Sequence, residues 1–385
     1  MRLFLCGDVM TGRGIDQVLT SPVDRVLHES YVGSAIDYVS LAEEANGPIP
    51  RRVAPSYVWG AALEELYHAR PDARIINLET SITRSDDCEP KGINYRMSPE
   101  NATCLKAADV DCCVLANNHV LDWGRAGLID TVATLQRLRI KTAGAGRALD
   151  EARAPAVLDI PGTGRVLVYS FASTTSGTPR AWAATRDTPG VNLLPDLSEA
   201  SAAHISDEIL QARRPRDVIV VSIHWGPNWG YEIPEAQRHF AHALIERAGV
   251  SIIHGHSSHH PKAIEMYRNR LILYGCGDFL NDYEGIRGYE DYRDDLPLMY
   301  LADLDPAEGD LAALEVVPFQ IRRFQLGRPS PQDIDWLRER LNREYLPFGV
   351  QVELLSDRRF AVSWPGKGKR DDSIQASSAG LSDPI

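Results

Sequence analysis

Short apolar runs alternate with amphipathic segments along most of the chain, and this alternation predicts an α/β fold. Seven apolar runs are expected to form strands: Leu3–Cys6, Ile75–Leu78, Cys112–Leu115, Leu167–Phe171, Val218–Ile223, Ile252–His254 and Leu271–Tyr274. Apolar residues at helical spacing predict helices at Val58–His68, Leu128–Leu138, Ser201–Arg213 and Glu235–Ala248. Pro234 precedes the last of these, at a position suited to the start of a helix.

The pattern changes after residue 290. Strands are expected at Leu298–Leu304, Leu314–Gln325, Val350–Leu355 and Phe360–Trp364, with a helix at Pro331–Tyr345. We therefore expect a main domain over residues 1–290 and a small strand-and-helix extension over 291–365 that packs on it. Residues 366–385 are rich in Gly, Ser, Asp and Lys, a composition typical of a disordered tail.

The charge balance excludes some classes of partner. The chain of 385 residues has 53 acidic and 41 basic side chains, a net charge of −12. Binding to nucleic acid or to an anionic membrane needs a basic face, so neither is expected. A small-molecule or peptide-like anionic substrate stays compatible with the composition, because bound metal ions can override the global field.

Membrane spans and disulfides are not expected from this sequence. No stretch approaches the roughly 18 apolar residues that cross a bilayer. The segment Met1–Cys6 is too short for a signal sequence and is interpreted as the first buried strand. Three of the six cysteines (Cys6, Cys112 and Cys113) lie in strand-like runs, which indicates buried reduced thiols. Together these features predict a cytoplasmic protein without a membrane anchor.

Residues of metal-ligating types follow five of the predicted strands, at the point where each strand ends. They are Asp8, Glu79, the run Asn117-Asn118-His119, His224, and the cluster His254-Gly255-His256-Ser257-Ser258-His259-His260. Loops beyond the carboxyl ends of strands in an open α/β sheet gather into one crevice, so these side chains can meet around one or two cations. Carboxylate, carboxamide and imidazole ligands together suit Mn, Fe or Zn.

Each of these elements also has an ordinary structural explanation. Asp8 could cap a helix, and Glu79 could be a solvated loop residue. The Asn-Asn-His run could form a turn, and His224 beside Trp225 could be a hydrogen-bonded core histidine. Four histidines within seven residues are harder to explain in this way, because the chain has only 11. The five elements together favour a metal site.

This set of motifs resembles the CapA/PgsA family of capsule or poly-γ-glutamate synthesis proteins, a branch of the calcineurin-like metallophosphoesterase superfamily. The motifs are Gly7-Asp8, Asn77-Leu78-Glu79, Ala116-Asn117-Asn118-His119, His224-Trp225-Gly226 and the histidine cluster, supported by Tyr95–Ala102, Leu121–Gly124 and Gly275–Phe279. The resemblance covers about residues 1–285. It implies a four-layer αββα sandwich, with two sheets facing each other and helices outside, to which a small C-terminal α/β extension is added.

The resemblance also implies a role for each matching residue. Asp8 would bridge two divalent cations, and the full set of implied ligands is Asp8, Glu79, Asn118, His224, His256 and His259. His119 would protonate the leaving group, and Asp122 would orient His119. These assignments imply a dinuclear site in which the cations activate a water molecule.

The chain departs from the superfamily pattern at two places. The histidine that normally follows the first Asp by two residues is replaced by Met10, so one metal shell is short of a ligand. In the last motif Ser257-Ser258 separates His256 from His259, which leaves the usual His-x-His register ambiguous and His254 as a spare ligand.

Two arginines and a tryptophan complete the candidate site. An arginine near two cations can fork onto a phosphate or carboxylate, so Arg13 and Arg96 are expected to bind the substrate, with Arg13 also aiding catalysis. Surface salt bridges are the alternative for both. Trp225 is expected to wall the substrate pocket, although packing in the core would explain it equally.

A metal-dependent hydrolase that cleaves a phosphoester is the function that these residues favour, with His119 as general acid. Two alternatives stay open. The enzyme could cleave a γ-glutamyl or other amide bond, or the chain could be a non-catalytic accessory protein of poly-γ-glutamate synthesis. Met10 favours the accessory role, whereas the Asn118-His119 pair and the lack of an anchor oppose it.

Overall fold

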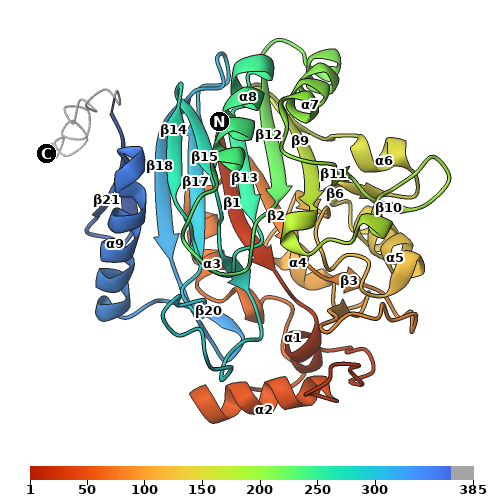
Figure 1. Cartoon of the computed structure of the whole chain (residues 1–385). Helices are drawn as coiled ribbons and strands as arrows, with labels where there is room; N and C mark the ends of the chain where they lie inside the picture. Colours follow the sequence, from red (N-terminus) through yellow and green to blue (C-terminus); the bar gives the residue numbers. More distant parts are fainter. Residues whose placement is uncertain (366–385) are drawn as a thin grey trace, which may run out of the picture.

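Two large β-sheets organise the chain in the computed structural model, which describes residues 1–365 (Figure 1). The first sheet has nine strands in the order β21-β22-β18-β17-β1-β2-β5-β6, with β16 paired to β1. These are β1 (Arg2–Val9), β2 (Ala73–Leu78), β5 (Cys112–Val114), β6 (Lys141–Ala143), β16 (Asp278–Leu280), β17 (Leu298–Leu304), β18 (Leu311–Pro318), β21 (Gln351–Leu354) and β22 (Phe360–Ser363). The predicted tail at 366–385 lies outside the described residues.

The second sheet has seven strands in the order β11-β9-β12-β13-β15-β14, with β8 paired to β9. They are β8 (Ala156–Ile160), β9 (Gly164–Ser173), β11 (Leu193–Leu194), β12 (Asp217–His224), β13 (Ile252–His256), β14 (Ile264–Tyr267) and β15 (Arg270–Leu273). Strands β9, β12, β13 and β15 run parallel to one another. Parallel strands covered on both faces read as continuous apolar runs, which explains the pattern of Val218–Ile223.

The alternation of side chains along β1 shows how the layers stack. Leu3 and Leu5 belong to a core cluster that also holds the second sheet. Phe4 and Cys6 point to the opposite face and join a cluster with helices on the other side of the first sheet. The helices of that cluster include α3 (Ala62–Ala69), α4 (Thr103–Ala107) and α5 (Gly124–Arg137), and α7 (Glu199–Ala212) and α8 (Glu235–Ala248) cover the second sheet (Figure 1). The predicted mixed α/β class is confirmed.

The C-terminal segment extends the first sheet directly. Strand β17 pairs antiparallel with β1, and β18, β22 and β21 follow outward. Helix α9 (Pro331–Tyr345) lies at the outer end of this sheet, beside β21 (Figure 1). It begins with a capping box between Ser330 and Asp333 and buries Leu337 and Leu341 in the cluster shared by the two sheets.

Several predicted boundaries differ from the structure. The helix expected at Val58–His68 begins only at Ala62, after a 3-10 turn at Tyr57–Trp59. The strand expected at Leu314–Gln325 ends at Pro318 and gives way to the hairpin β19 (Gln320–Arg322) and β20 (Gln325–Gly327). Short elements complete the described chain: α1 (Arg13–Val18), α2 (Ala35–Asn46), α6 (Leu149–Arg153), β3 (Ser81–Ile82), β4 (Arg96–Met97), β7 (Ala145–Gly146), β10 (Gly190–Val191) and 3-10 turns at Thr174–Ser176, Arg180–Trp182 and Leu346–Phe348.

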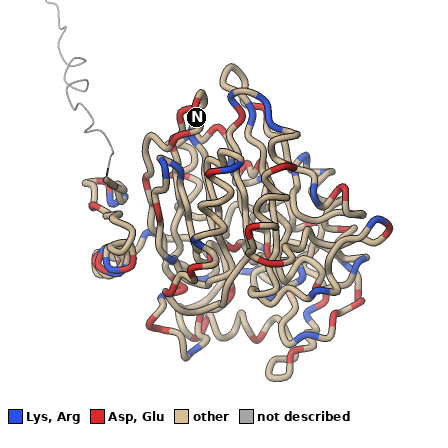
Figure 2. Tube along the Cα trace, turned by 45° about the horizontal axis from the view of Figure 1, so that its top comes forward, with Lys and Arg blue, Asp and Glu red and all other residues tan. Residues whose placement is uncertain are grey.

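Basic and acidic positions are mixed along the described chain. In the view of Figure 2, Lys and Arg positions are interspersed with Asp and Glu positions along the outer segments. No helix in residues 1–365 has the length and apolar character needed to cross a membrane. All six cysteines are free thiols, and five of them are buried. The three whose burial was predicted, Cys6, Cys112 and Cys113, are among these five.

We predict that Leu337→Ala destabilises the whole fold, because Leu337 is 1% exposed within the core between the sheets. The loss should be about 2–5 kcal/mol in a single unfolding transition, as for other large-to-small core changes. Chemical denaturation followed by circular dichroism measures it. Glu339→Ala, an exposed change on the same helix, is the control and should stay within about 0.5 kcal/mol of the parent. Two separate transitions would show that residues 291–365 form an independent unit.

Candidate metal centre

The carboxyl ends of strands from both sheets meet in one crevice. In the first sheet Asp8 of β1 lies opposite Asn77 of β2 on one side and Asp278 of β16 on the other. In the second sheet His224 of β12 lies opposite His256 of β13. Within each sheet, the strand register therefore places these side chains directly beside one another.

Close approach of the chain to itself determines two positions around Asp8. A Cβ atom at Gly7 would lie 1.6 Å from the carbonyl oxygen of Gly277, so only glycine fits at residue 7. The amide of Asp8 donates to that same carbonyl at 3.0 Å. Gly277 itself has a φ of +77°, a conformation that other L-residues rarely adopt. The two glycines allow β16 to bring Asp278 beside Asp8.

Asp8 is fully buried and hydrogen-bonded on both oxygens. Its Oδ1 accepts from the side-chain amide of Asn77 at 2.7 Å, and Oδ2 accepts from the backbone amide of Ser257 at 3.2 Å. The Asn77 amide also donates to Glu79 Oε2 at 3.2 Å, so it joins two carboxylates. Burial and repulsion from Asp278 raise the pKa of Asp8 to about 7. Burial and repulsion from Asp8 raise the pKa of Glu79 as well.

Asp8, His224 and His256 form a first group of three ligand atoms, all within 4.8 Å of one another. The Nδ1 atoms of the two histidines are 2.7 Å apart, and His256 Nδ1 is 3.8 Å from Asp8 Oδ1. The other ring nitrogen of His256 contacts the Ser222 hydroxyl at 2.7 Å. A hydrogen bond of this kind fixes the orientation of a ligating imidazole.

Asp8, His259 and Asp278 form a second such group, again within 4.8 Å. His259 Nδ1 is 2.9 Å from Asp278 Oδ1, and Asn281 donates to Asp278 Oδ2 at 2.8 Å. Burial opposes a charge on His259, but the Asp278 carboxylate outweighs this effect and raises the pKa of the imidazole. The side-chain amide of Asn228 contacts the other ring nitrogen of His259 at 3.0 Å.

The donors of the two groups could hold metal ions, and Asp8 belongs to both groups. Three buried carboxylates lie together, and burial raises the pKa of each, so positive charge would stabilise all three. Oxygen and imidazole donors without thiolate suit the borderline divalent metals. Asp278 was not among the predicted ligands. It lies beyond the predicted strand Leu271–Tyr274, after Gly275-Cys276-Gly277, and is the first residue of β16, so a rule based on strand ends does not select it directly.

Glu79 and Asn118 lie on the His224 side of the crevice. Asn118 Oδ1 is 2.9 Å from His224 Nε2, and Glu79 Oε1 is 3.7 Å from the same nitrogen. Glu79 Oε1 is also 3.8 Å from His119 Nε2. The structure thus brings together all six predicted metal ligands, although they are spread over most of the first 260 positions.

The histidine cluster separates into distinct environments. His256 and His259 belong to the two different ligand groups. His254 instead spans the gap between the sheets, with Nε2 2.7 Å from the carbonyl oxygen of Cys6. His260 packs its ring 4.4 Å from Tyr231, and its Nε2 has no hydrogen-bond partner within residues 1–365. The cluster therefore contributes one histidine, His256 or His259, to each ligand group.

His119 is held by a network of charged and polar groups. Its Nδ1 lies 2.7 Å from Asp122 Oδ2, and Lys91 Nζ donates to Asp122 Oδ1 at 2.7 Å. The backbone amide of Tyr95 donates to Asp122 Oδ2 at 2.6 Å, and the Tyr95 ring packs edge-on against His119. Burial lowers the pKa of His119 to about 4. This network leaves Nε2 directed toward Glu79.

Lys91 and Tyr95 are positioning residues that the sequence did not single out for this role. Lys91 also donates to the backbone carbonyl of Asn118. Tyr95 was quoted only within a supporting motif, and Lys91 lies in an irregular loop between Cys88 and Asn94. No periodicity or motif spacing links a loop lysine to a histidine 28 residues away.

Arg13 lies in a buried ion-pair network. It pairs with Asp282 at 2.5 Å and with Glu29 at 3.1 Å, and its guanidinium lies 3.8 Å from the ring centre of Tyr38 and 4.4 Å from that of Tyr95. The structural salt bridge considered for this residue is present, in the interior instead of at the surface. The guanidinium of Arg13 donates hydrogen bonds to Asp282 and Glu29 from all three of its nitrogen atoms.

The other two predicted substrate contacts also make structural interactions. Arg96 donates to Asp86 at 2.9 Å and lies over the Trp123 ring at 3.7 Å. Trp225 is buried in the core, donates its indole N–H to the carbonyl of Tyr274 at 3.0 Å and stacks on the Tyr274 ring. Neither side chain lines the cavity beside His259 described below.

The fold and the crevice together define an α/β protein with a buried histidine–carboxylate centre that could hold metal ions. The sequence matches the family described as bacterial capsule synthesis protein PGA_cap over residues 2–283. This chain belongs to that family. The CapA/PgsA resemblance seen in its motifs is thereby confirmed.

Similar proteins carry names from the same area of biology. A probable polyglutamine synthesis accessory protein of Mycobacterium tuberculosis is 45% identical over 362 residues, which cover 94% of this chain and 95% of the relative. The PGA biosynthesis protein CapA of Bacillus subtilis is 27% identical over 357 residues, covering 92% and 78% of the two chains. The capsule biosynthesis protein CapA of Bacillus anthracis is 26% identical over 290 residues, covering 74% and 62%.

A solved structure shows only a remote likeness. The N-acetyl-D-glucosamine-6-phosphate deacetylase from Mycobacterium smegmatis aligns with 14% identity and a TM-score of 0.27, over 85% of this chain and 99% of that chain. A score at this level supports no shared fold.

We predict that Asp8→Asn removes the binding of both cations, because Asp8 is common to the two ligand groups. Asp278→Asn should weaken one site and leave the other, so manganese stoichiometry should fall from about two toward about one per chain. Isothermal titration calorimetry and elemental analysis measure these changes. Asp291→Asn, an exposed change of the same type, is the control and should keep the parent stoichiometry. Equal losses in the Asp8 and Asp278 variants would contradict two distinct sites.

Proposed function

We propose that this chain is a metal-dependent hydrolase of the metallophosphoesterase type, acting on a phosphoester. The observation that carries the proposal is the sharing of Asp8 between two buried ligand groups, with His119 next to them. The stacking of helices on the outer faces of two facing sheets supports the αββα sandwich that this class uses. The free, mostly buried thiols support a cytoplasmic location.

The ligands in this proposal are the predicted set together with the additional carboxylate: Asp8, Glu79, Asn118, His224, His256, His259 and Asp278. When bound, two Mn, Fe or Zn ions would polarise the scissile group and make a water molecule a better nucleophile. The buried environment of the ligands excludes bulk water and strengthens the electrostatic interactions of the centre. Asn77 keeps Asp8 and Glu79 at a fixed separation through its two hydrogen bonds.

His119 is the proposed proton donor. Asp122 holds its Nδ1, so Nε2 is the atom that can pass a proton to the leaving group. An anionic substrate beside the ring would favour the protonated imidazole. Lys91 and Tyr95 position Asp122 through their hydrogen bonds to its two oxygens. Arg13 packs on the ring of Tyr95 and so supports the region around His119. It also lines the adjoining cavity, where it could contact the substrate.

Hydrolysis of an amide, such as a γ-glutamyl bond, is the second candidate. The names of the relatives favour it, because they refer to polyglutamine synthesis and PGA biosynthesis. The same centre could polarise an amide carbonyl, and His119 could protonate the departing nitrogen. A non-catalytic accessory role in polymer synthesis is the third outcome, and it would be favoured if no bond in either class were cleaved.

We predict that His119→Ala lowers the turnover of an alkyl phosphoester by about 100- to 10,000-fold while metal content stays near the parent value. His119 is assigned to proton donation, so the loss should shrink for a nitrophenyl ester, whose leaving group needs little protonation. Steady-state kinetics with added manganese, on a panel of phosphoesters and γ-glutamyl peptides, measures both effects. Asp122→Asn should give an intermediate loss, since it loosens His119 without removing it.

His224→Ala is the comparison variant for this test. His224 belongs to a ligand group, so this change should lower metal content and turnover together. Equal loss of metal in the His119 and His224 variants would show that His119 is a ligand. Unchanged turnover in His119→Ala would remove it from the mechanism.

A further inference from the structure

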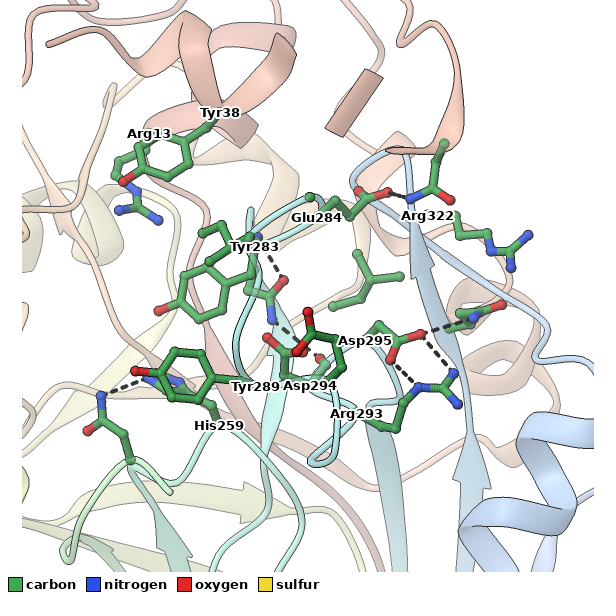
Figure 3. Close-up of a pocket in the computed structure, with 18 of the residues that line it drawn as sticks. Arg13, Tyr38, His259, Tyr283, Glu284, Tyr289, Arg293, Asp294, Asp295 and Arg322 are labelled. Atoms are coloured by element: carbon green, nitrogen blue, oxygen red, sulfur yellow. Dashed lines mark hydrogen bonds and ion pairs between the residues drawn. The ribbon is translucent and has the colours of Figure 1, made fainter. Parts of the chain in front are cut away.

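A cavity of about 480 Å³ adjoins the metal centre (Figure 3). His259 of the second ligand group forms part of its lining, together with residues from the segment 281–295 and from α2. The ring of His259 packs 5.1 Å from Trp229 and edge-on at 5.2 Å from Tyr283. A molecule in the cavity would therefore lie next to any group bound at the cations.

Two arginines of the lining, the buried Arg13 and the half-buried Arg293, are already neutralised by carboxylates. Arg13 pairs with Asp282 and Glu29, neither of which lines the cavity. Arg293 pairs with Asp295 at 2.7 Å and with Asp333 at 2.6 Å. An anionic ligand would have to compete with these carboxylates, which already accept hydrogen bonds from both guanidinium groups.

The carboxylates of the lining differ from one another in their partners. Glu284 accepts hydrogen bonds from two backbone amides and from Asn46, and Asp295 accepts from Arg293 and Gln320. Asp294, in contrast, receives no side-chain hydrogen bond and forms no ion pair within residues 1–365. Figure 3 shows Asp294 between Tyr289 and the Arg293–Asp295 pair.

Two oppositely charged side chains lie at the exposed rim: Glu290, whose charged neighbour is Arg287, and Arg322, whose charged neighbour is Glu284. Asp294 is therefore the lining carboxylate without a side-chain partner within residues 1–365. Burial and repulsion from Asp278 and Asp295 raise its pKa to about 7, and a cation bound beside it would favour its charged form.

Aromatic faces line the cavity near this carboxylate. Tyr289 stacks on Trp229 with ring centres 4.1 Å apart and an angle of 5° between the planes. Tyr38 and Tyr283 also belong to the lining. Aromatic rings next to an available carboxylate attract organic cations, because the π face and the charge act together.

We propose that this cavity binds an organic ammonium group, with Asp294 as its counter-ion and Tyr289 and Trp229 as its aromatic wall. This proposal rests on the proposed function in one respect: it assigns the ammonium group to the substrate of the hydrolase. The scissile bond of that substrate would lie at the cations, on the other side of His259. The substrate class is then an ester or amide that has a positively charged nitrogen close to the reacting group. A polyanionic segment would be repelled from the same space.

Binding of an isosteric pair tests this directly. Choline and 3,3-dimethyl-1-butanol have nearly the same shape and differ by the positive charge. Isothermal titration calorimetry on the metal-free full-length chain measures both affinities without any reaction. We expect choline to bind at least about 10-fold more tightly than the neutral alcohol. Asp294→Asn should remove most of this preference.

Asp291→Asn is the matched control, because it makes the same charge change at an exposed position of the same segment outside the lining. It should keep the preference for choline. Equal affinities for the two compounds, no binding of choline, or a preference that survives Asp294→Asn would each overturn the inference.

Hydrolysis of bis(4-nitrophenyl) phosphate with manganese tests the proposed function separately, since this ester has no ammonium group. Choline binding without hydrolysis would contradict the proposed hydrolase function and support the assignment of the cavity to an ammonium group. Hydrolysis without a preference for choline would contradict the assignment of the cavity and support the proposed hydrolase function.

Discussion

The burial of three carboxylates in one crevice is the constraint on which the rest of this structure depends. Asp8, Glu79 and Asp278 are withdrawn from water, and burial raises the pKa of each. Buried like charges are destabilising unless hydrogen bonds or cations balance them. The Asn77 amide and the His259 imidazole supply part of that balance, and divalent cations would supply the rest. Strongly shifted groups of this kind cluster where a protein performs chemistry.

Two sheets, and not one, are needed to hold this arrangement. The first sheet supplies the carboxylates from adjacent strands, and the second supplies His224 and His256 from a parallel pair. His254 connects the sheets just behind the centre through its contact with Cys6. Side chains placed on strand ends vary little in position, because the ladder hydrogen bonds fix the backbone that bears them.

The parts of the fold and site that could be predicted follow local rules. Apolar runs located most strands of both sheets but not the short or edge strands β6, β8, β11, β14 and β16, and ligand-type residues at strand ends located the crevice. Helix α2 was missed although its buried residues Ala35, Tyr38, Val39 and Ala42 have helical spacing, because two of the four are alanines and the apolar face is small. Lys91 and the cavity beside His259 depend on irregular loops whose paths are set by tertiary packing, and a single sequence has no spacing rule for them.

The position of β1 in the first sheet determines when this protein can fold during its synthesis. Its neighbours are β2, β16 and β17, and Arg2 pairs with Asp303, a residue 301 positions later in the chain. The hydrogen bonds between β1 and its neighbours β16 and β17 can therefore form only after most of the polypeptide has left the ribosome. Contacts between such distant segments slow folding and expose apolar strands in the meantime. Nascent chains of this protein should therefore depend on chaperones more than a protein of local contacts would.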